Sequence, residues 1–163
     1  VTGFFKTPEP LIQKEFSRIM SLKDGTKKMS KSELSDLSRI NLTDSEDEII
    51  NKIKKAKTDT QPLPTSIEEL NERPEAKNLL GIYSSMTNNT LEKSVKKFDG
   101  KNFSEFKEEL SQVLVEKIGP ISKEIKKLTE DKKFLDKILK DGQIKANDVA
   151  SNKLKKIHEI IGF

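Results

Sequence analysis

Cysteine and tryptophan are absent from the sequence, and histidine and tyrosine occur once each, as His158 and Tyr83. Without cysteine, neither a disulfide framework nor a thiolate metal site can form, and a single histidine excludes a histidine-rich metal site. No apolar run approaches the roughly 20 residues that a membrane-spanning helix needs. The first ten residues lack the basic and apolar regions of a signal peptide. We therefore expect a cytoplasmic protein with no membrane partner.

Apolar residues are scarce and charged residues are abundant, at 33% and 36% of 163 residues. That balance suits thin amphipathic helices better than a thick sheet core. The net charge of +4 lies in the last third, because residues 114–163 contain 12 lysines against 8 acidic residues. A basic helical region is compatible with a polyanionic partner, although a solvated lysine-rich helix face is the simpler explanation.

The pattern changes near residues 40–43. Residues 1–40 contain one short apolar run (16–22), which fits a short helix or a buried strand that ends in a functional loop. After residue 43, apolar residues recur at helical spacing and predict an all-α bundle of five or six helices. Thr43 or Asp44 would cap the first of them.

Four further signals mark helix boundaries. Ser66 has capping-box spacing to Glu69, and Pro74 suits the first position of a helix. Gly119-Pro120 predicts a kink or break in the long periodic segment 102–130. Gly142 predicts the end of a helix.

The run TKKMSKSEL (residues 26–34) follows the turn signal Asp24-Gly25 and holds three lysines. Lys28 and Lys31 could converge on one polyanion, because a lysine is a movable point charge. Ser30 and Ser32 add hydroxyl donors, and a turn would point backbone N–H groups inward. Phosphoryl or adenylyl transfer needs such positioned positive charge. By chemistry alone, an ordinary solvated loop remains the simpler interpretation.

The run KMSKS (the lysine loop, residues 28–32) resembles the second signature of class I aminoacyl-tRNA synthetases. Its flank RIMSLKDGTKKMSKSE resembles the version found in tryptophanyl-tRNA synthetases. Three later segments are similar to the same family in the same order, so the resemblance covers essentially the whole chain. They are IINKIKKAKTDTQPLP, RPEAKNLLGIYSSMT and LKDGQIKANDVASNKLKKIHEIIGF.

This resemblance implies a carboxy-terminal half, because the family's amino-terminal His-x-Gly-His motif and tryptophan pocket are not in the sequence. It implies a mainly α fold, with the end of a Rossmann-type catalytic domain over residues 1–40 and an α-helical anticodon-binding domain over residues 41–163. The full-length enzyme would activate L-tryptophan with ATP and Mg²⁺, transfer it to tRNA(Trp) and form a homodimer through the missing half. The isolated chain is expected to be inactive.

The resemblance also assigns site residues. Lys28 and Lys31 match the family's catalytic loop lysines, with Lys31 the expected partner of the ATP phosphates. Glu33 stands where the family usually has aspartate, which keeps the charge. The residues expected to bind ATP are Ile19, whose backbone would meet the adenosine, and Lys28, Met29, Ser30, Lys31 and Ser32.

Other interpretations stay open. The chain could be a stand-alone helical tRNA-binding module, the same part of a tyrosyl-tRNA synthetase, or a helical interaction protein with a chance motif. We expect His158 to be a packed or surface histidine, and Tyr83 to be a core residue rather than a platform for base stacking. Five basic residues could contact tRNA phosphates or simply form a solvated face: Arg39, Lys52, Lys54, Lys55 and Lys57.

Overall fold

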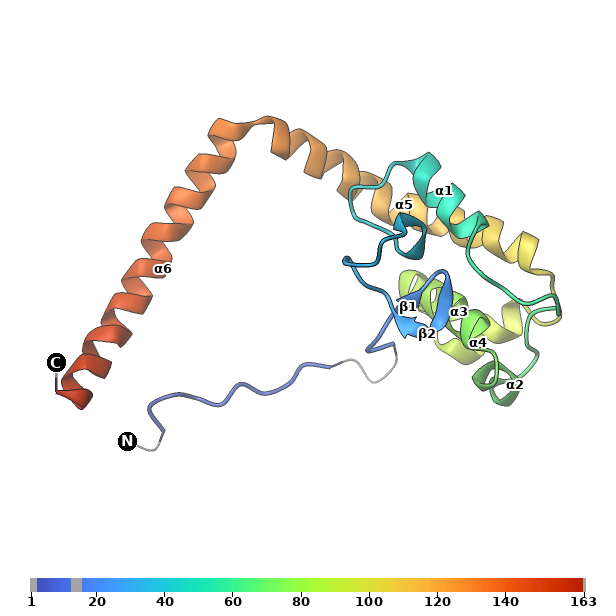
Figure 1. Cartoon of the computed structure of the whole chain (residues 1–163), viewed down its shortest axis with the longest axis horizontal. Helices are drawn as coiled ribbons and strands as arrows, with labels where there is room; N and C mark the ends of the chain where they lie inside the picture. The colour runs from blue at the N-terminus through green and yellow to red at the C-terminus, as the bar shows by residue number, and fades with distance from the viewer. Residues whose placement is uncertain (1–2, 13–15, 163) are drawn as a thin grey trace. The chain divides into compact units, whose positions relative to one another are not determined.

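The computed structural model describes residues 3–12 and 16–162. Within them lie a two-stranded antiparallel sheet, one short 3-10 helix and six α-helices, which confirms a mainly α fold (Figure 1). Two compact units are present, residues 1–120 and residues 121–163. The elements are β1 (Met20–Ser21), β2 (Asp24–Lys28), η1 (Asp36–Ser38), α1 (Glu46–Lys54), α2 (Ile67–Asn71), α3 (Pro74–Thr87), α4 (Leu91–Lys97), α5 (Phe103–Glu130) and α6 (Lys132–Ile161).

The start of α1 differs from the prediction. Ser45 caps the helix instead of Thr43 or Asp44: its side chain accepts from the Glu48 N–H, and the Glu48 side chain accepts from the Ser45 N–H. Because this capping box satisfies two backbone donors reciprocally, Asp44 is left for another partner, described below.

The predicted starts of α2 and α3 are confirmed. The Ser66 hydroxyl accepts from the Glu69 N–H at the start of α2. Pro74 occupies the first turn of α3, where the missing N–H costs nothing.

The predicted break at Gly119-Pro120 and the predicted helix end at Gly142 are wrong, and the alternative of a kink at Gly119-Pro120 stays a prediction. α5 continues through Gly119-Pro120, with Ile118 buried before the proline and Ser122 buried after it. Proline removes one helical hydrogen bond but keeps a helical φ, and the 28-residue helix continues past it. α6 continues through Gly142, where glycine costs only about 1 kcal/mol relative to alanine.

The core of the first unit is built around three aromatic rings. Tyr83 on α3 meets Phe98 edge-on at 4.9 Å between centroids, and Phe98 meets Phe106 on α5 at 4.8 Å. Aromatic edge-to-face pairs add to the free energy gained by burying apolar area. Tyr83 is buried, so its prediction as a core residue is confirmed. Aliphatic side chains complete this core: Leu22, Ile49, Ile53, Leu63, Leu70, Leu79, Leu80, Leu110 and Leu114.

The second unit contains the end of α5 and all of α6. α6 has no buried residue within its bounds, and His158 lies exposed near its end. The helix stops at Gly162, whose φ of 85° is readily adopted by glycine. Over the described residues, none of the helices has the combination of length and low charge that a membrane span requires.

Candidate functional site

The lysine loop leaves the end of a β-hairpin. β1 and β2 pair antiparallel, with Met20 opposite Lys28, and the Met29 N–H donates to the Ile19 carbonyl at 3.0 Å. Lys28 is therefore the last residue of β2, and the loop proper begins at Met29. Ile19 and Met29 are both half-buried against the core. The hairpin thus places Ile19, the residue expected to meet adenosine, directly beside the start of the lysine loop.

A side chain of α3 anchors this hairpin. The buried Asn78 amide accepts from the Met20 N–H at 2.9 Å and donates to the Met20 carbonyl at 2.8 Å. The Asn78 side chain therefore pairs with the Met20 backbone of β1 as the backbone of a neighbouring strand would. Sequence reasoning assigned Asn78 no role, although a polar residue directly before the apolar run LLGIY was a signal.

The hairpin turn also packs closely on the start of α3. A Cβ at Gly25 would lie 2.5 Å from the carbonyl carbon of Pro74, so only glycine fits there without movement. Next to it, the buried Leu22 exchanges backbone hydrogen bonds with two other segments: its N–H donates to Ser38, and its carbonyl accepts from Lys57 at 2.7 Å. The hairpin is therefore fixed to the helical part of the first unit at several points.

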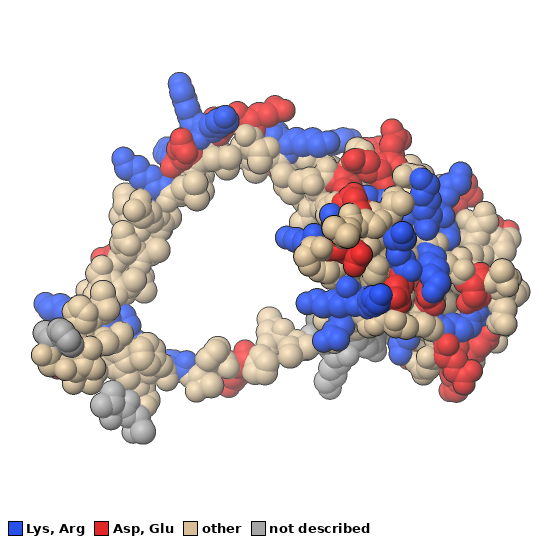
Figure 2. Space-filling model, viewed as in Figure 1, with Lys and Arg blue, Asp and Glu red and all other residues tan. Residues whose placement is uncertain are grey.

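The lysine loop itself is accessible. Lys28, Lys31 and Ser32 are exposed and Ser30 is half-buried. The two serine hydroxyls lie 2.9 Å apart, and the Glu33 N–H donates to the Ser30 carbonyl at 3.4 Å, which curls the chain into a turn. Figure 2 shows Lys and Arg side chains gathered over the hairpin and α1. The structure therefore presents two exposed ammonium groups, one on the last residue of β2 and one on the turn that follows it.

A buried ion-pair network joins the segment after the loop to α1. Lys52 is only 3% exposed, and its ammonium lies 2.7 Å from Asp44 Oδ2 and 2.5 Å from Asp36 Oδ2. Burial alone would lower the pKa of Lys52, but hydrogen bonds to the two carboxylates outweigh burial and raise it. The hydrogen bond from Lys52 lowers the pKa of Asp36. Lys52 is thus neither solvated nor available to a tRNA phosphate, because two carboxylates neutralise it.

The other basic candidates lie in different surroundings. Arg39 is half-buried and donates to the Glu33 carbonyl at 2.9 Å. Lys57 pairs with Glu75 at 2.8 Å while remaining exposed. Lys54 and Lys55 are exposed at the end of α1. Of the five basic residues, those at the end of α1 remain the most accessible to a polyanion.

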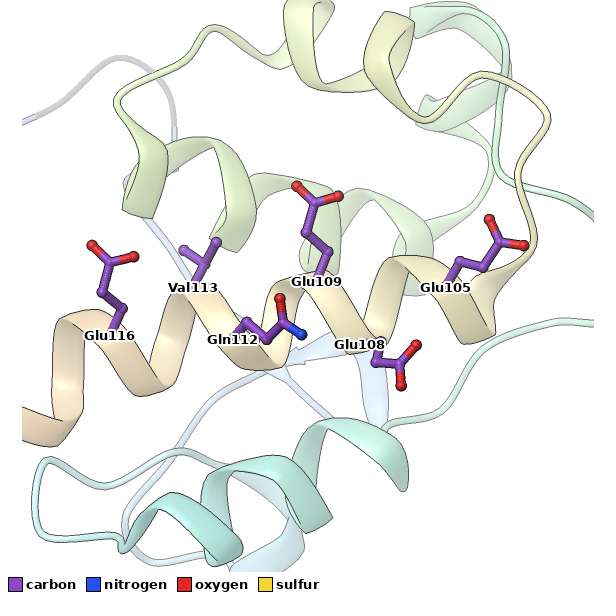
Figure 3. A pocket seen from close by; sticks show the side chains of 6 residues that line it. All are labelled: Glu105, Glu108, Glu109, Gln112, Val113 and Glu116. Carbon is purple, nitrogen blue, oxygen red and sulfur yellow. The ribbon is translucent and has the colours of Figure 1, made fainter.

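Figure 3 shows a hollow on α5 that is lined by acidic side chains. One of them, Glu109, accepts from the Tyr83 hydroxyl at 2.7 Å and pairs with Lys97. A concentration of carboxylates repels phosphate, so this hollow does not suit ATP or RNA. Its lining residues are Glu105, Glu108, Glu109, Gln112, Val113 and Glu116. Over residues 3–12 and 16–162, no three acidic or histidine side chains are grouped to hold a metal ion.

Comparisons with known proteins agree on one family. The family model for class I tRNA synthetases (W and Y) matches residues 2–118. A tryptophan–tRNA ligase of Brucella melitensis is 46% identical over 163 residues, which is all of this chain and 46% of the relative. One of Mesorhizobium japonicum is 47% identical with the same coverage. The chain thus spans about half the length of the curated relatives it matches.

A solved structure supports the same fold. The tryptophanyl-tRNA synthetase of Mycoplasma pneumoniae aligns with a TM-score of 0.73 and 26% identity, over 93% of this chain and 45% of that one. The sequence match covers residues 2–118, and the structural match covers nearly the whole chain. The chain therefore belongs to the class I tRNA synthetases that serve tryptophan and tyrosine.

Proposed function

We propose that this chain is the carboxy-terminal half of a tryptophan–tRNA ligase, and that its lysine loop acts on ATP. The observation that carries the proposal is 46–47% identity to tryptophan–tRNA ligases over the entire chain. The exposed lysine pair on an anchored hairpin supports it, because positive charge held at the reacting phosphates stabilises the negative charge that develops there. The domain boundary at residues 40–41 and a cytoplasmic location are part of the same proposal.

In the proposed reaction, a carboxylate oxygen of L-tryptophan attacks the α-phosphorus of ATP and pyrophosphate leaves. Negative charge grows on the leaving phosphates, and Lys31, with Lys28, would stabilise it by moving onto them as the loop closes. Ser30 and Ser32 would donate hydrogen bonds from their hydroxyl groups to the same phosphate oxygens, because the two hydroxyl oxygens already lie 2.9 Å apart. Met29 and Ile19 would hold the loop beside the adenosine, since the Met29 N–H donates a hydrogen bond to the Ile19 carbonyl.

Mg²⁺ would arrive with the phosphates. It keeps phosphate and water ligands and needs few protein ligands, which agrees with a lysine loop that offers no carboxylate of its own. After activation, the tryptophanyl group would pass to tRNA(Trp), held by the helical part of the chain. We further propose that the full-length enzyme is a homodimer through the half not contained in this sequence.

Tryptophan-dependent exchange of pyrophosphate into ATP tests the proposal. The isolated chain should show none. The full-length enzyme, in which this chain follows the amino-terminal half that naturally precedes it, should exchange with tryptophan and not with tyrosine. Exchange with tyrosine alone would assign the chain to a tyrosyl enzyme instead. Exchange by the isolated chain would overturn the expectation that the missing half is needed.

Binding of tRNA to the isolated chain tests the helical part. We expect tRNA(Trp) to bind with an affinity that falls steeply with salt, because lysines would displace counterions from the phosphates. A tRNA(Trp) transcript with an altered anticodon is the matched control and should bind more weakly. Equal binding of the two transcripts would contradict anticodon recognition by this chain.

A further inference from the structure

The two ends of the lysine loop are held in different ways. At the amino-terminal end, the loop is continuous with β2 and with the Met29–Ile19 hydrogen bond. At the carboxy-terminal end, the chain has left the sheet, and Leu34 is fully exposed. There the Glu33 carbonyl accepts a hydrogen bond from Arg39 Nη1 at 2.9 Å. This contact ties the residue immediately after the loop to the segment that leads into α1.

Arg39 is itself held in place. Its Nη2 lies 2.9 Å from Asp36 Oδ1, and its Nε donates to Asn41 Oδ1 at 3.2 Å. All three guanidinium nitrogens therefore have partners, and the side chain is 17% exposed. A planar guanidinium with several fixed partners is preorganised in a way that a lysine is not. Engaged in this way, Arg39 is poorly placed to bind a phosphate.

The partners of Arg39 continue into the buried network. Asp36 also pairs with Lys52, and the Asn41 amide donates to Asp36 Oδ1 at 3.1 Å and to Asp44 Oδ1 at 3.0 Å. Lys52 lies on α1, with 3% of its surface exposed. An unbroken series of polar contacts therefore runs from a buried residue of α1 to the end of the lysine loop.

We propose that Arg39 is a positioning residue for the lysine loop, which it holds by the Glu33 carbonyl. This inference rests on the proposed function of that loop in ATP activation. Arg39 does not touch ATP. It limits the positions that the end of the loop can sample, so that Lys31 reaches the phosphates from a restricted range. Groups displaced by about 1 Å lose up to about 10²-fold in rate, so this restriction has kinetic consequences.

The kinetic test uses the full-length enzyme with Arg39→Ala, Arg39→Lys and Arg73→Ala. Arg73 is the matched control: it is equally engaged, donating to Pro62 O at 2.7 Å and to Asp59 at 2.6 Å and 3.0 Å, with no contact to the lysine loop among these. We expect Arg39→Ala to lower kcat for pyrophosphate exchange by about 10-fold to 100-fold. Arg73→Ala should lower the melting temperature but change kcat by less than about twofold.

Arg39→Lys separates position from charge. Lysine keeps the positive charge but cannot bridge Glu33, Asp36 and Asn41 at once, so we expect it to recover little of the lost kcat. Full recovery by lysine would mean that Arg39 acts as a general positive charge, and it would overturn the proposal. Equal loss of kcat in Arg39→Ala and Arg73→Ala would do the same, because it would reduce Arg39 to a stabilising residue.

A second measurement does not depend on catalysis. In the isolated 163-residue chain, Arg39→Ala should raise backbone mobility at Ser32 and Glu33, measured by nitrogen-15 relaxation, and leave Leu80 in the core unchanged. Unchanged relaxation at Ser32 and Glu33 would overturn the positioning role. If the wild-type full-length enzyme shows no exchange while Arg39→Ala still loosens the loop, the proposed function fails and the restraint stands as a structural fact.

Discussion

Replacing Lys52 by methionine should strongly destabilise the first unit. Methionine keeps most of the length and volume but removes the ammonium that neutralises Asp44, of which 5% is exposed. Breaking a buried ion pair from one side costs about 3–5 kcal/mol, because the remaining charge is left without its partner. Asp36 contributes less to this cost, since 54% of its side chain is exposed and water can solvate it.

That loss is large against the total stability of a domain, which is about 5–15 kcal/mol. For a unit of residues 1–120, it corresponds to a fall in melting temperature of about 10–20 °C. Urea unfolding followed by the fluorescence of Tyr83 measures the loss in free energy of unfolding. Tyr83 is the single tyrosine and lies in this core, and the chain has no tryptophan whose fluorescence would mask it.

Two variants give this prediction its controls. Lys55→Met changes an exposed lysine at the end of the same helix and should alter stability by less than about 0.5 kcal/mol. Adding Asp44→Asn to Lys52→Met removes the unpaired charge and should restore at least half of the loss. A cost below about 1 kcal/mol for Lys52→Met, the range of surface ion pairs, would refute the argument for a buried network.

Two further predictions concern pH and glycine. Hydrogen bonds from lysine partners hold the pKa values of Asp36 and Glu75 below their ordinary range. The two carboxylates therefore stabilise the folded state above about pH 4.5, and this stabilisation is lost as the pH falls further. A free energy of unfolding in urea that is unchanged down to about pH 2.5 would contradict this. Gly25→Ala should lower stability by about 1–3 kcal/mol, because its Cβ meets the Pro74 backbone. Gly142→Ala adds a Cβ with no other atom within 4 Å, so it should raise the helicity of α6, measured by circular dichroism. A Gly25→Ala variant as stable as the wild type, or a Gly142→Ala variant with lower helicity, would contradict the corresponding prediction.

Local signals in the sequence predicted several elements of this fold. The start of α3 at Pro74 and of α2 after Ser66 follow from capping chemistry that acts within one helical turn. Tyr83 appeared as a core residue because apolar spacing reports one helix face. The resemblance of residues 28–32 to a family signature identified the lysine loop, and the comparisons confirm the family.

Long-range contacts decided what local signals could not. Lys52 and Lys55 look alike in a lysine-rich segment, and Lys52 is buried because Asp36 and Asp44 converge on it from outside the helix. Asn78 anchors a strand 58 residues earlier in the chain, which no spacing rule reports. Pro120 stays inside α5 although it removes one helical hydrogen bond, which a local rule for helix breakers does not report.

The central proposal is that the lysine loop stabilises the reacting phosphates of ATP. Its most direct test is the kcat of tryptophan-dependent pyrophosphate exchange by the full-length enzyme carrying Lys31→Ala, with Lys27→Ala as the matched control. Lys27 is also exposed and pairs with Asp24 on the same hairpin, one residue before the loop. We predict that Lys31→Ala lowers kcat by about 10²-fold or more, the scale of losing one preorganised charge at the transition state, and that Lys27→Ala changes it by less than about threefold. An unchanged kcat with an effect confined to KM, or equal effects of the two substitutions, would contradict the proposal.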